Sequence, residues 1–185
     1  MPNPNAEMMT LTSELIRSSV HEVNRLEVAV GSEYGEFRGR YERAVPELDI
    51  GRLGELMRSG AGWDAVLRVT DENAPYEFIR YWDFDATALM RLAGDRWNCV
   101  EYLMGNHTIA QRMYTHNPAV MLYAPLRTAI YEDAGGRVWF AVDQPSTRFG
   151  SFGDPGITEV GVELDHKLAS LLEYLGVPVP DVLRG

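Results

Sequence analysis

The chain contains very little cysteine and very little lysine. Cys99 is the only cysteine among the 185 residues, so no disulfide can form within the chain. Its neighbours belong to an apolar run, which favours a buried structural thiol over a reactive nucleophile. Lys167 is the only lysine, and the arginines are scattered along the sequence. Because a nucleic-acid surface needs clustered basic residues, we expect no nucleic-acid partner.

Excess positive charge and long apolar runs are also missing. Acidic residues number 27 against 17 basic ones, which gives a formal net charge of -10. No run reaches the roughly 20 apolar residues that a membrane-spanning helix needs, so we expect no membrane partner. Residues 1–5 have neither the charged nor the apolar region of a signal peptide. We therefore predict a cytoplasmic protein.

The rest of the composition is that of an ordinary globular domain, with 45% hydrophobic and 24% charged residues. A chain of this length can bury a core without disulfide or metal support. We expect an N-terminal arm or short helix over residues 1–23. A single domain should follow over residues 24–185, with a helical insertion at residues 49–74.

Periodic patterns place the first elements. Alternating apolar residues at positions 26, 28 and 30 predict a strand. Ser32 is a suitable N-cap for a helix that ends before Pro46, and Asp49 can cap the helical insertion. Four more strands are predicted from aromatic and branched residues, and the last two form a hairpin. Their ranges are 77–84, 97–104, 123–132 and 137–143.

The last predicted element is a long helix. Asp154 can cap it, Pro155 fits the first helical position, and apolar residues recur at helical spacing as far as Leu175. Gly176 ends it. The glycine- and serine-rich stretch 146–153 before this helix is predicted to be a loop that closes over a site. Short connections between the later strands favour an antiparallel sheet with helices on one face, a two-layer α+β domain.

The stretch from Glu101 to Pro145 is the densest in distinctive residues. It contains Gly105-Asn106, then NPAVMLYAPLR, then the hairpin YEDAGGRVWF. Together with the order of the elements, this stretch resembles the family called domain of unknown function 302, over about residues 24–176. The resemblance implies a TATA-binding-protein-like α+β fold with about five antiparallel strands in the order β-α-β-β-β-β-α. It implies no activity. His107 stands where that family usually has proline, which suggests a divergent branch with its own site.

Four residues are predicted to be catalytic: His107, Glu101, Asp143 and Arg127. A helix N-terminus favours a neutral imidazole, so His107 suits acid/base catalysis, although it could simply be a loop histidine. Glu101 and Asp143 lie on predicted strands, where a partly buried carboxylate can serve as a base. Arg127 would point into a sheet face, either as a clamp for a carboxylate or enolate or as a member of a buried ion pair.

Aromatic residues concentrate around the predicted strands, and we expect them to line a pocket for an apolar small molecule. Ordinary cores have the same composition, so this interpretation has an alternative. By alternation, Tyr102 shares a face with Met104, and Trp139 shares a face with Asp143. The residues predicted to bind substrate are Tyr81, Tyr102, Asn106, Met113, Tyr123, Trp139, Phe149 and Phe152.

No spacing typical of metal ligands and no nucleotide fingerprint occurs, so we expect neither a metal nor a cofactor. We predict an enzyme that applies acid/base catalysis to an apolar, carbonyl-bearing metabolite, such as the cyclisation, lactonisation or isomerisation of a polyketide-like substrate in secondary metabolism. A non-catalytic binding or carrier protein with the same pocket is the alternative. A protein interface made by the aromatic face is a third hypothesis. The protein is expected to be a monomer or a homodimer.

Overall fold

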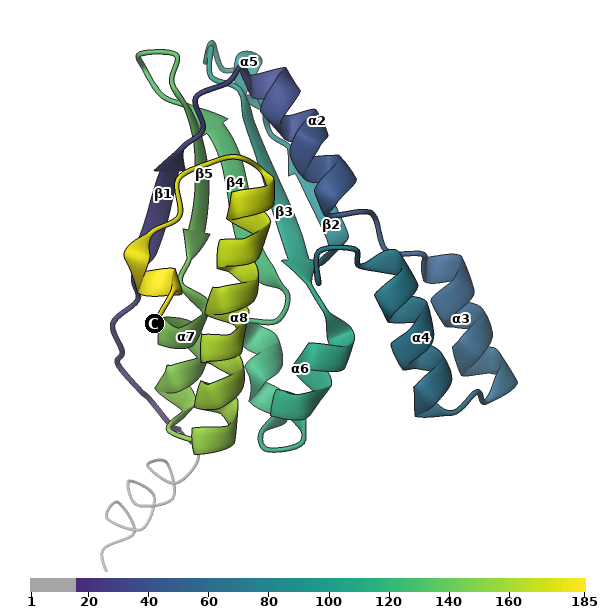
Figure 1. Cartoon of the computed structure of the whole chain (residues 1–185). Coiled ribbons are helices and arrows are strands. Elements are labelled where there is room, and N and C mark those ends of the chain that lie inside the picture. The colour runs from purple at the N-terminus through teal and green to yellow at the C-terminus, as the bar shows by residue number, and fades with distance from the viewer. Residues whose placement is uncertain (1–15) are drawn as a thin grey trace, which may run out of the picture.

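The structure, a computed structural model, describes residues 16–185 (Figure 1). Of the arm or short helix predicted over residues 1–23, the first 15 residues lie outside the described part. Residues 16–24 have no regular secondary structure and lead directly into the first strand.

Five strands form one antiparallel sheet in the order β1-β5-β4-β3-β2. Their bounds are β1 Arg25–Ala29, β2 Ile79–Asp85, β3 Cys99–Gly105, β4 Leu126–Glu132 and β5 Val138–Asp143. All five predicted strands are present. β4 begins later than predicted because residues 123–125 belong to the turn that links it to a 3-10 helix, η1 (Pro118–Leu122). Burial alternates along β4 and β5, so one face of the sheet is buried and the other is open.

Two helices cover the buried face, α2 (Tyr34–Ala44) and α8 (Pro155–Tyr174) (Figure 1). The two-layer α+β fold is therefore confirmed. Asp154 caps α8 as predicted, because its side chain accepts hydrogen bonds from the Gly156 and Ile157 amides. The cap predicted for α2 is wrong. Its N-cap residue is Glu33 with no side-chain bond, while the Ser32 hydroxyl accepts a bond from Arg40.

The core lies between these two layers. Fully buried aromatic residues from α2, β3 and β5 meet there, and the apolar stripe of α8 packs on them. Its largest buried members include Phe37, Tyr41, Tyr102, Met104, Phe140 and Leu168. A domain that buries this many large apolar side chains needs no disulfide or metal to hold it.

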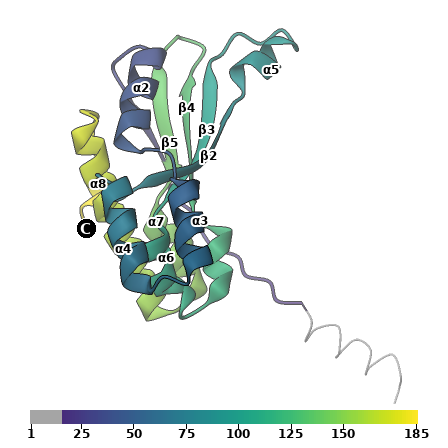
Figure 2. The same cartoon turned by 90° about the vertical axis from the view of Figure 1, so that its right-hand side faces the viewer.

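The helical insertion is present as two helices, α3 (Ile50–Ser59) and α4 (Trp63–Asn73), which stand beside the main body next to α6 (Figure 2). Asp49 caps α3 as predicted. α3 has no buried residue, and α4 buries only Thr70. At the base, the Asn73 amide donates to the Glu47 carbonyl and accepts from the Asp49 amide.

The connections contain more helix than the sequence predicted. α5 (Thr87–Arg91) was not predicted, whereas α6 (His107–Tyr114) begins at His107, where the sequence predicted a helix N-terminus. The stretch predicted as a loop is helical, forming α7 (Pro145–Phe149) and a 3-10 turn, η2 (Gly150–Phe152). It packs tightly on α8 because Gly161 has no side chain. A Cβ there would lie 3.1 Å from both the Phe149 Cβ and the Ser146 Cα.

A last 3-10 turn, η3, spans Asp181–Leu183. Across residues 16–185, no helix is both long enough and apolar enough to cross a membrane.

Candidate functional site

A cavity of about 320 Å³ lies at the end of the sheet where β3 passes into α6. α6, α7 and α8 form its sides, and the segment leading into β4 completes it. Most of its lining is apolar, including Ile109, Met113, Met121, Pro125, Phe149 and Leu164. A cavity of this size and character suits a small apolar ligand.

Gly105, the last residue of β3, allows the wall of this cavity to close. A Cβ at Gly105 would lie 3.2 Å from the Pro125 Cβ, 3.3 Å from the Pro125 Cα and 3.7 Å from the Tyr81 ring. These separations leave almost no room for a side chain, since packed interiors have few voids. The missing side chain lets Pro125 and Tyr81 approach the strand end from two directions.

Asn106 fixes the start of α6. Its side-chain oxygen accepts hydrogen bonds from the Thr108 and Ile109 amides at 2.9 and 3.4 Å, and its amide nitrogen donates to the Glu77 carbonyl at 3.0 Å. Glu77 has a φ of 69°, a strained value for a residue with a side chain. Asn106 lines the cavity as predicted, but its polar atoms are occupied within the protein. It holds the wall rather than offering a free group to a ligand.

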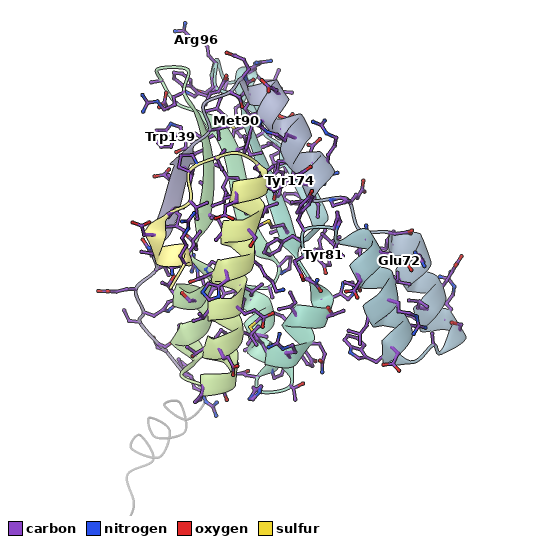
Figure 3. All side chains as sticks on the ribbon, viewed as in Figure 1. Glu72, Tyr81, Met90, Arg96, Trp139 and Tyr174 are labelled. Atoms are coloured by element: carbon purple, nitrogen blue, oxygen red, sulfur yellow. The ribbon has the colours of Figure 1, made fainter. Side chains whose placement is uncertain are left out.

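His107, the first residue of α6, is held by two hydroxyl groups. Its Nδ1 lies 2.8 Å from the Tyr81 hydroxyl, and its Nε2 lies 2.7 Å from the Thr70 hydroxyl of α4. Tyr81 lies on the side of the body that faces the helical hairpin (Figure 3). Both His107 and Tyr81 line the cavity, so they contribute its paired titratable groups.

The hydrogen-bond chain fixes the proton on the imidazole. The Thr70 hydroxyl lies 2.8 Å from the Val66 carbonyl, which can only accept. A hydroxyl has one proton, and Thr70 donates it to Val66, so His107 Nε2 must carry a proton and donate to Thr70. His107 Nδ1 is then free to accept the Tyr81 proton. The geometry thus assigns a neutral imidazole with its proton on Nε2.

Burial moves both pKa values in the direction that keeps this pair neutral. Loss of hydration lowers the pKa of His107 below its ordinary value of 6.5. It also raises the pKa of Tyr81 to about 12. Because desolvation disfavours the charged form of each group, imidazole and phenol face each other uncharged near neutral pH. One group can accept a proton while the other can donate one.

The three other residues predicted to be catalytic lie elsewhere. Glu101 and Arg127 form an ion pair at 2.9 Å on the open face of the sheet. The Arg127 side chain is 76% exposed, so the buried ion pair considered for it is wrong. Asp143 pairs with Arg25 at 3.5 Å and with Arg148.

Strand alternation explains this separation. Glu101 and Arg127 lie on the opposite side of the sheet from the helix layer, whereas His107 has already left the strand. Arg127, Asp143 and Tyr123 instead line a second, more polar cavity of about 350 Å³. The structure therefore does not bring Glu101, Asp143 or Arg127 to His107.

The predicted substrate-binding residues also divide into groups. Met113 and Phe149 line the first cavity with Tyr81, and both are buried. Tyr102 lies in the core, where its hydroxyl donates to Glu42 at 2.8 Å and its pKa is raised by burial. It is closed off from either cavity by its neighbours.

Trp139 and Phe152 complete the set and lie away from the first cavity. Trp139 is on the open face, toward the β1 side of the sheet (Figure 3), and its indole donates to Asp133 at 2.8 Å. Phe152 packs edge-on against Tyr123 with 5.9 Å between ring centres. Alternation correctly grouped Tyr102 with Met104 and Trp139 with Asp143, but it could not say which face of the sheet held a cavity.

Sequence reasoning missed the partner that orients the imidazole. Thr70 lies near the end of the predicted helical insertion, and nothing in its local pattern distinguishes it from a surface threonine. Its role depends on the hairpin standing next to α6, which is a tertiary fact. Within residues 16–185, no group of three or more His, Cys, Asp or Glu side chains could hold a metal ion.

These features define a two-layer α+β domain with an apolar cavity at one end of its sheet and a tyrosine–histidine pair in the cavity wall. A family model described as "Domain of unknown function DUF302" matches residues 63–175, and the chain belongs to this family. The matched range includes Thr70, Tyr81 and His107.

One solved structure with this fold is the uncharacterized conserved protein DUF302 from Bacillus stearothermophilus. It superposes with a TM-score of 0.58 at 18% sequence identity, covering 82% of this chain and 97% of that chain. At this identity the likeness concerns the fold alone. No curated protein matches the chain.

Proposed function

We propose that the protein binds an apolar carbonyl compound in the first cavity and moves a proton on it, using Tyr81 and His107 as the acid/base pair. The observation that carries this proposal is the neutral Tyr81–His107 hydrogen bond of 2.8 Å in the wall of an otherwise apolar cavity of about 320 Å³. A hydrogen-bonded phenol and imidazole can exchange one proton with little movement of heavy atoms.

The pair can exist in two proton arrangements. In the first, Tyr81 donates to His107 Nδ1, and Nε2 donates to Thr70. In the second, Nδ1 carries the proton and donates to Tyr81, so the tyrosine proton is free to reach a ligand oxygen. Nε2 then accepts from Thr70, which turns its hydroxyl away from Val66. A ligand carbonyl favours the second arrangement because it provides the acceptor that this arrangement needs.

Isomerisation is the simplest reaction within reach of this pair. The reaction starts from the first arrangement, in which Nδ1 carries no proton, and needs a β,γ-unsaturated ketone. A proton on the carbon beside the carbonyl passes to the Tyr81 oxygen while the tyrosine proton moves to His107 Nδ1, which leaves a dienolate and an imidazolium. Returning a proton from this pair to the γ-carbon moves the double bond and restores both residues, so no other reactant is consumed. Cyclisation or lactonisation of a polyketide-like substrate uses the same proton movements with the substrate folded by the apolar walls.

A carrier protein is the second proposal, and one feature of the cavity favours it. Both nitrogens of His107 already have partners, and among the described residues that line the cavity there is no carboxylate to serve as a further base. A protein of this kind would use Tyr81 only to hold a ligand oxygen. Binding would then occur without turnover.

Deuterium exchange into acetophenone, a small apolar ketone, separates these possibilities. Exchange of its methyl protons in D₂O is followed by NMR, and binding is measured separately by calorimetry. Tyr81→Phe removes only the hydroxyl, and we expect it to slow protein-catalysed exchange roughly 100-fold or more. Tyr114→Phe is the matched control, because Tyr114 also lines the cavity but has no contact with His107 among the hydrogen bonds of the site.

The outcomes distinguish the enzyme from the carrier protein. Exchange that survives in Tyr114→Phe and is lost in Tyr81→Phe supports the enzyme. Ketone binding without exchange supports the carrier. Absence of binding in the wild-type protein refutes both uses of the cavity.

A further inference from the structure

The open face of the sheet, opposite α2 and α8, carries an ordered grid of side chains. Residues directly opposite each other on neighbouring strands share a face. Trp82 faces Leu103, Phe84 faces Glu101, and Ala129 faces Ala141 in the strand register. The grid therefore has Trp82 and Phe84 along β2 at its edge, Ala129 and Ala141 near its centre, and the Tyr131–Trp139 pair next to the alanines.

The aromatic edge is exposed to solvent. Trp82 and Phe84 are 46% and 40% exposed, and their rings stack with centres 6.0 Å apart and planes 13° from parallel. They form a ridge along β2. Ala129 and Ala141 lie farther in, between Glu101 of β3 and Glu27 of β1 in the strand register. Their methyl groups rise much less above the sheet than aromatic rings do, which leaves a shallow hollow. A ridge and a hollow on one surface can each fit the other on a second copy related by a two-fold axis.

Charge also distinguishes this face. The whole chain carries a net charge of -10, which makes two copies repel each other over most approaches. On the open face the charged side chains are already partnered. Arg127 pairs with Glu101, and Asp143 pairs with Arg25 and with Arg148 of α7. Glu27 accepts a hydrogen bond from the Tyr131 hydroxyl.

We propose that this open face is the interface of a homodimer, with the Trp82–Phe84 ridge of each copy lying in the Ala129–Ala141 hollow of the other. Five strands about 4.8 Å apart and about 20 Å long give a face of roughly 500 Å². Two such faces bury on the order of 1,000 Å², the size at which specific interfaces begin. An interface of this size gives a reversible dimer rather than an obligate one. This inference does not depend on the proposed acid/base function.

Sedimentation velocity of the full chain over about 1–200 µM protein tests the dimer, since a reversible dimer of micromolar affinity dissociates within this range. Ala129→Arg fills the hollow with a long charged side chain, and Trp82→Ser removes half of the ridge. Both changes lie on an open surface, so folding should persist. Met57→Arg is the matched control, because Met57 is 70% exposed but lies on α3, away from the sheet. Melting temperature confirms that each variant is folded.

We expect the wild-type mass to rise with concentration from 20.8 kDa toward twice that value. Either face variant should raise the dissociation constant at least 10-fold, and Met57→Arg should leave it unchanged. A constant mass of 20.8 kDa over the whole range would overturn the inference. So would a dimer that survives both face variants, or one that is lost in Met57→Arg.

Discussion

Thr70→Val is the substitution that isolates the orientation of His107. Thr70 is 1% exposed, and valine has nearly the same shape, so the change removes a hydroxyl without leaving a large void. Threonine and valine also have similar helix propensities. What is lost is the acceptor for the Nε2 proton, at 2.7 Å, and the donor to the Val66 carbonyl.

The expected destabilisation follows from these bonds. An unpaired buried polar group costs about 1–3 kcal/mol, and His107 is only half-buried, which places the cost near the low end. The Val66 carbonyl can remain bonded within the helix. We therefore expect the free energy of unfolding to fall by about 1 kcal/mol. For a chain of this size that corresponds to a melting temperature about 2–4 °C lower.

A double-mutant cycle tests whether this loss of stability comes from the Thr70–His107 hydrogen bond. In a His107→Phe background there is no Nε2 proton to satisfy, so Thr70→Val should then change stability very little. Urea unfolding of the four proteins gives the coupling energy, which we expect to be about 1 kcal/mol. Thr70→Ser keeps the hydroxyl and should keep most of the coupling.

The imidazole tautomer gives a second measurement. Nitrogen-15 NMR of wild-type His107 should find the proton on Nε2, and Thr70→Val should shift it toward Nδ1, where Tyr81 can still serve as an acceptor. Additive effects of the two substitutions, or a wild-type proton on Nδ1, would refute the hydrogen-bond chain as described.

Three further predictions concern stability. Gly105→Ala should lower the free energy of unfolding by about 1–3 kcal/mol, because its Cβ would press on Pro125, whereas Gly35→Ala, with nothing within 4 Å, should leave it unchanged or slightly higher; thermal unfolding compares them. Asn106→Ala removes a helix cap and a bond to a neighbouring carbonyl, so urea unfolding should reveal a loss of about 2 kcal/mol, and no loss would contradict the structural role. Because burial lowers the pKa of His107 in the folded protein, the unfolded chain binds a proton first as the pH falls, so stability should decrease below about pH 6.5. His107→Gln should remove the part of this decrease that His107 causes. Urea midpoints measured across pH 5–7 (roughly the range in which histidine titrates) test this, and a variant whose pH profile matches that of the wild type would contradict the prediction.

The sheet was predictable from the sequence because its strands are coded locally. The alternation of apolar residues along β4 and β5 was enough to predict these strands, and the apolar stripe of α8 was enough to predict that helix. The segment between Gln144 and Asp154 was misread because glycine and serine suggest a loop. Its helical turns are stabilised instead by contact with α8 at Gly161, which no local pattern reveals.

The site was predictable only in part. His107 stood out because it follows a strand end and an N-cap, and Tyr81 stood out as an aromatic residue of β2. Glu101 and Asp143 looked equally suitable, since partly buried carboxylates on strands have no local mark of which face they occupy. Packing of the helix layer decides that question, and it leaves both residues on the open side.

The α3–α4 hairpin gives the protein an exchangeable part. Its two ends lie next to each other, joined through the Asn73 amide, and it contributes only Thr70 to the buried interior. A change in the hairpin that moves Thr70 therefore alters the hydrogen bond to His107 Nε2, while the residues that line the first cavity stay the same. Replacing the α3–α4 hairpin would therefore change the surroundings of His107 and leave the sheet and its covering helices intact.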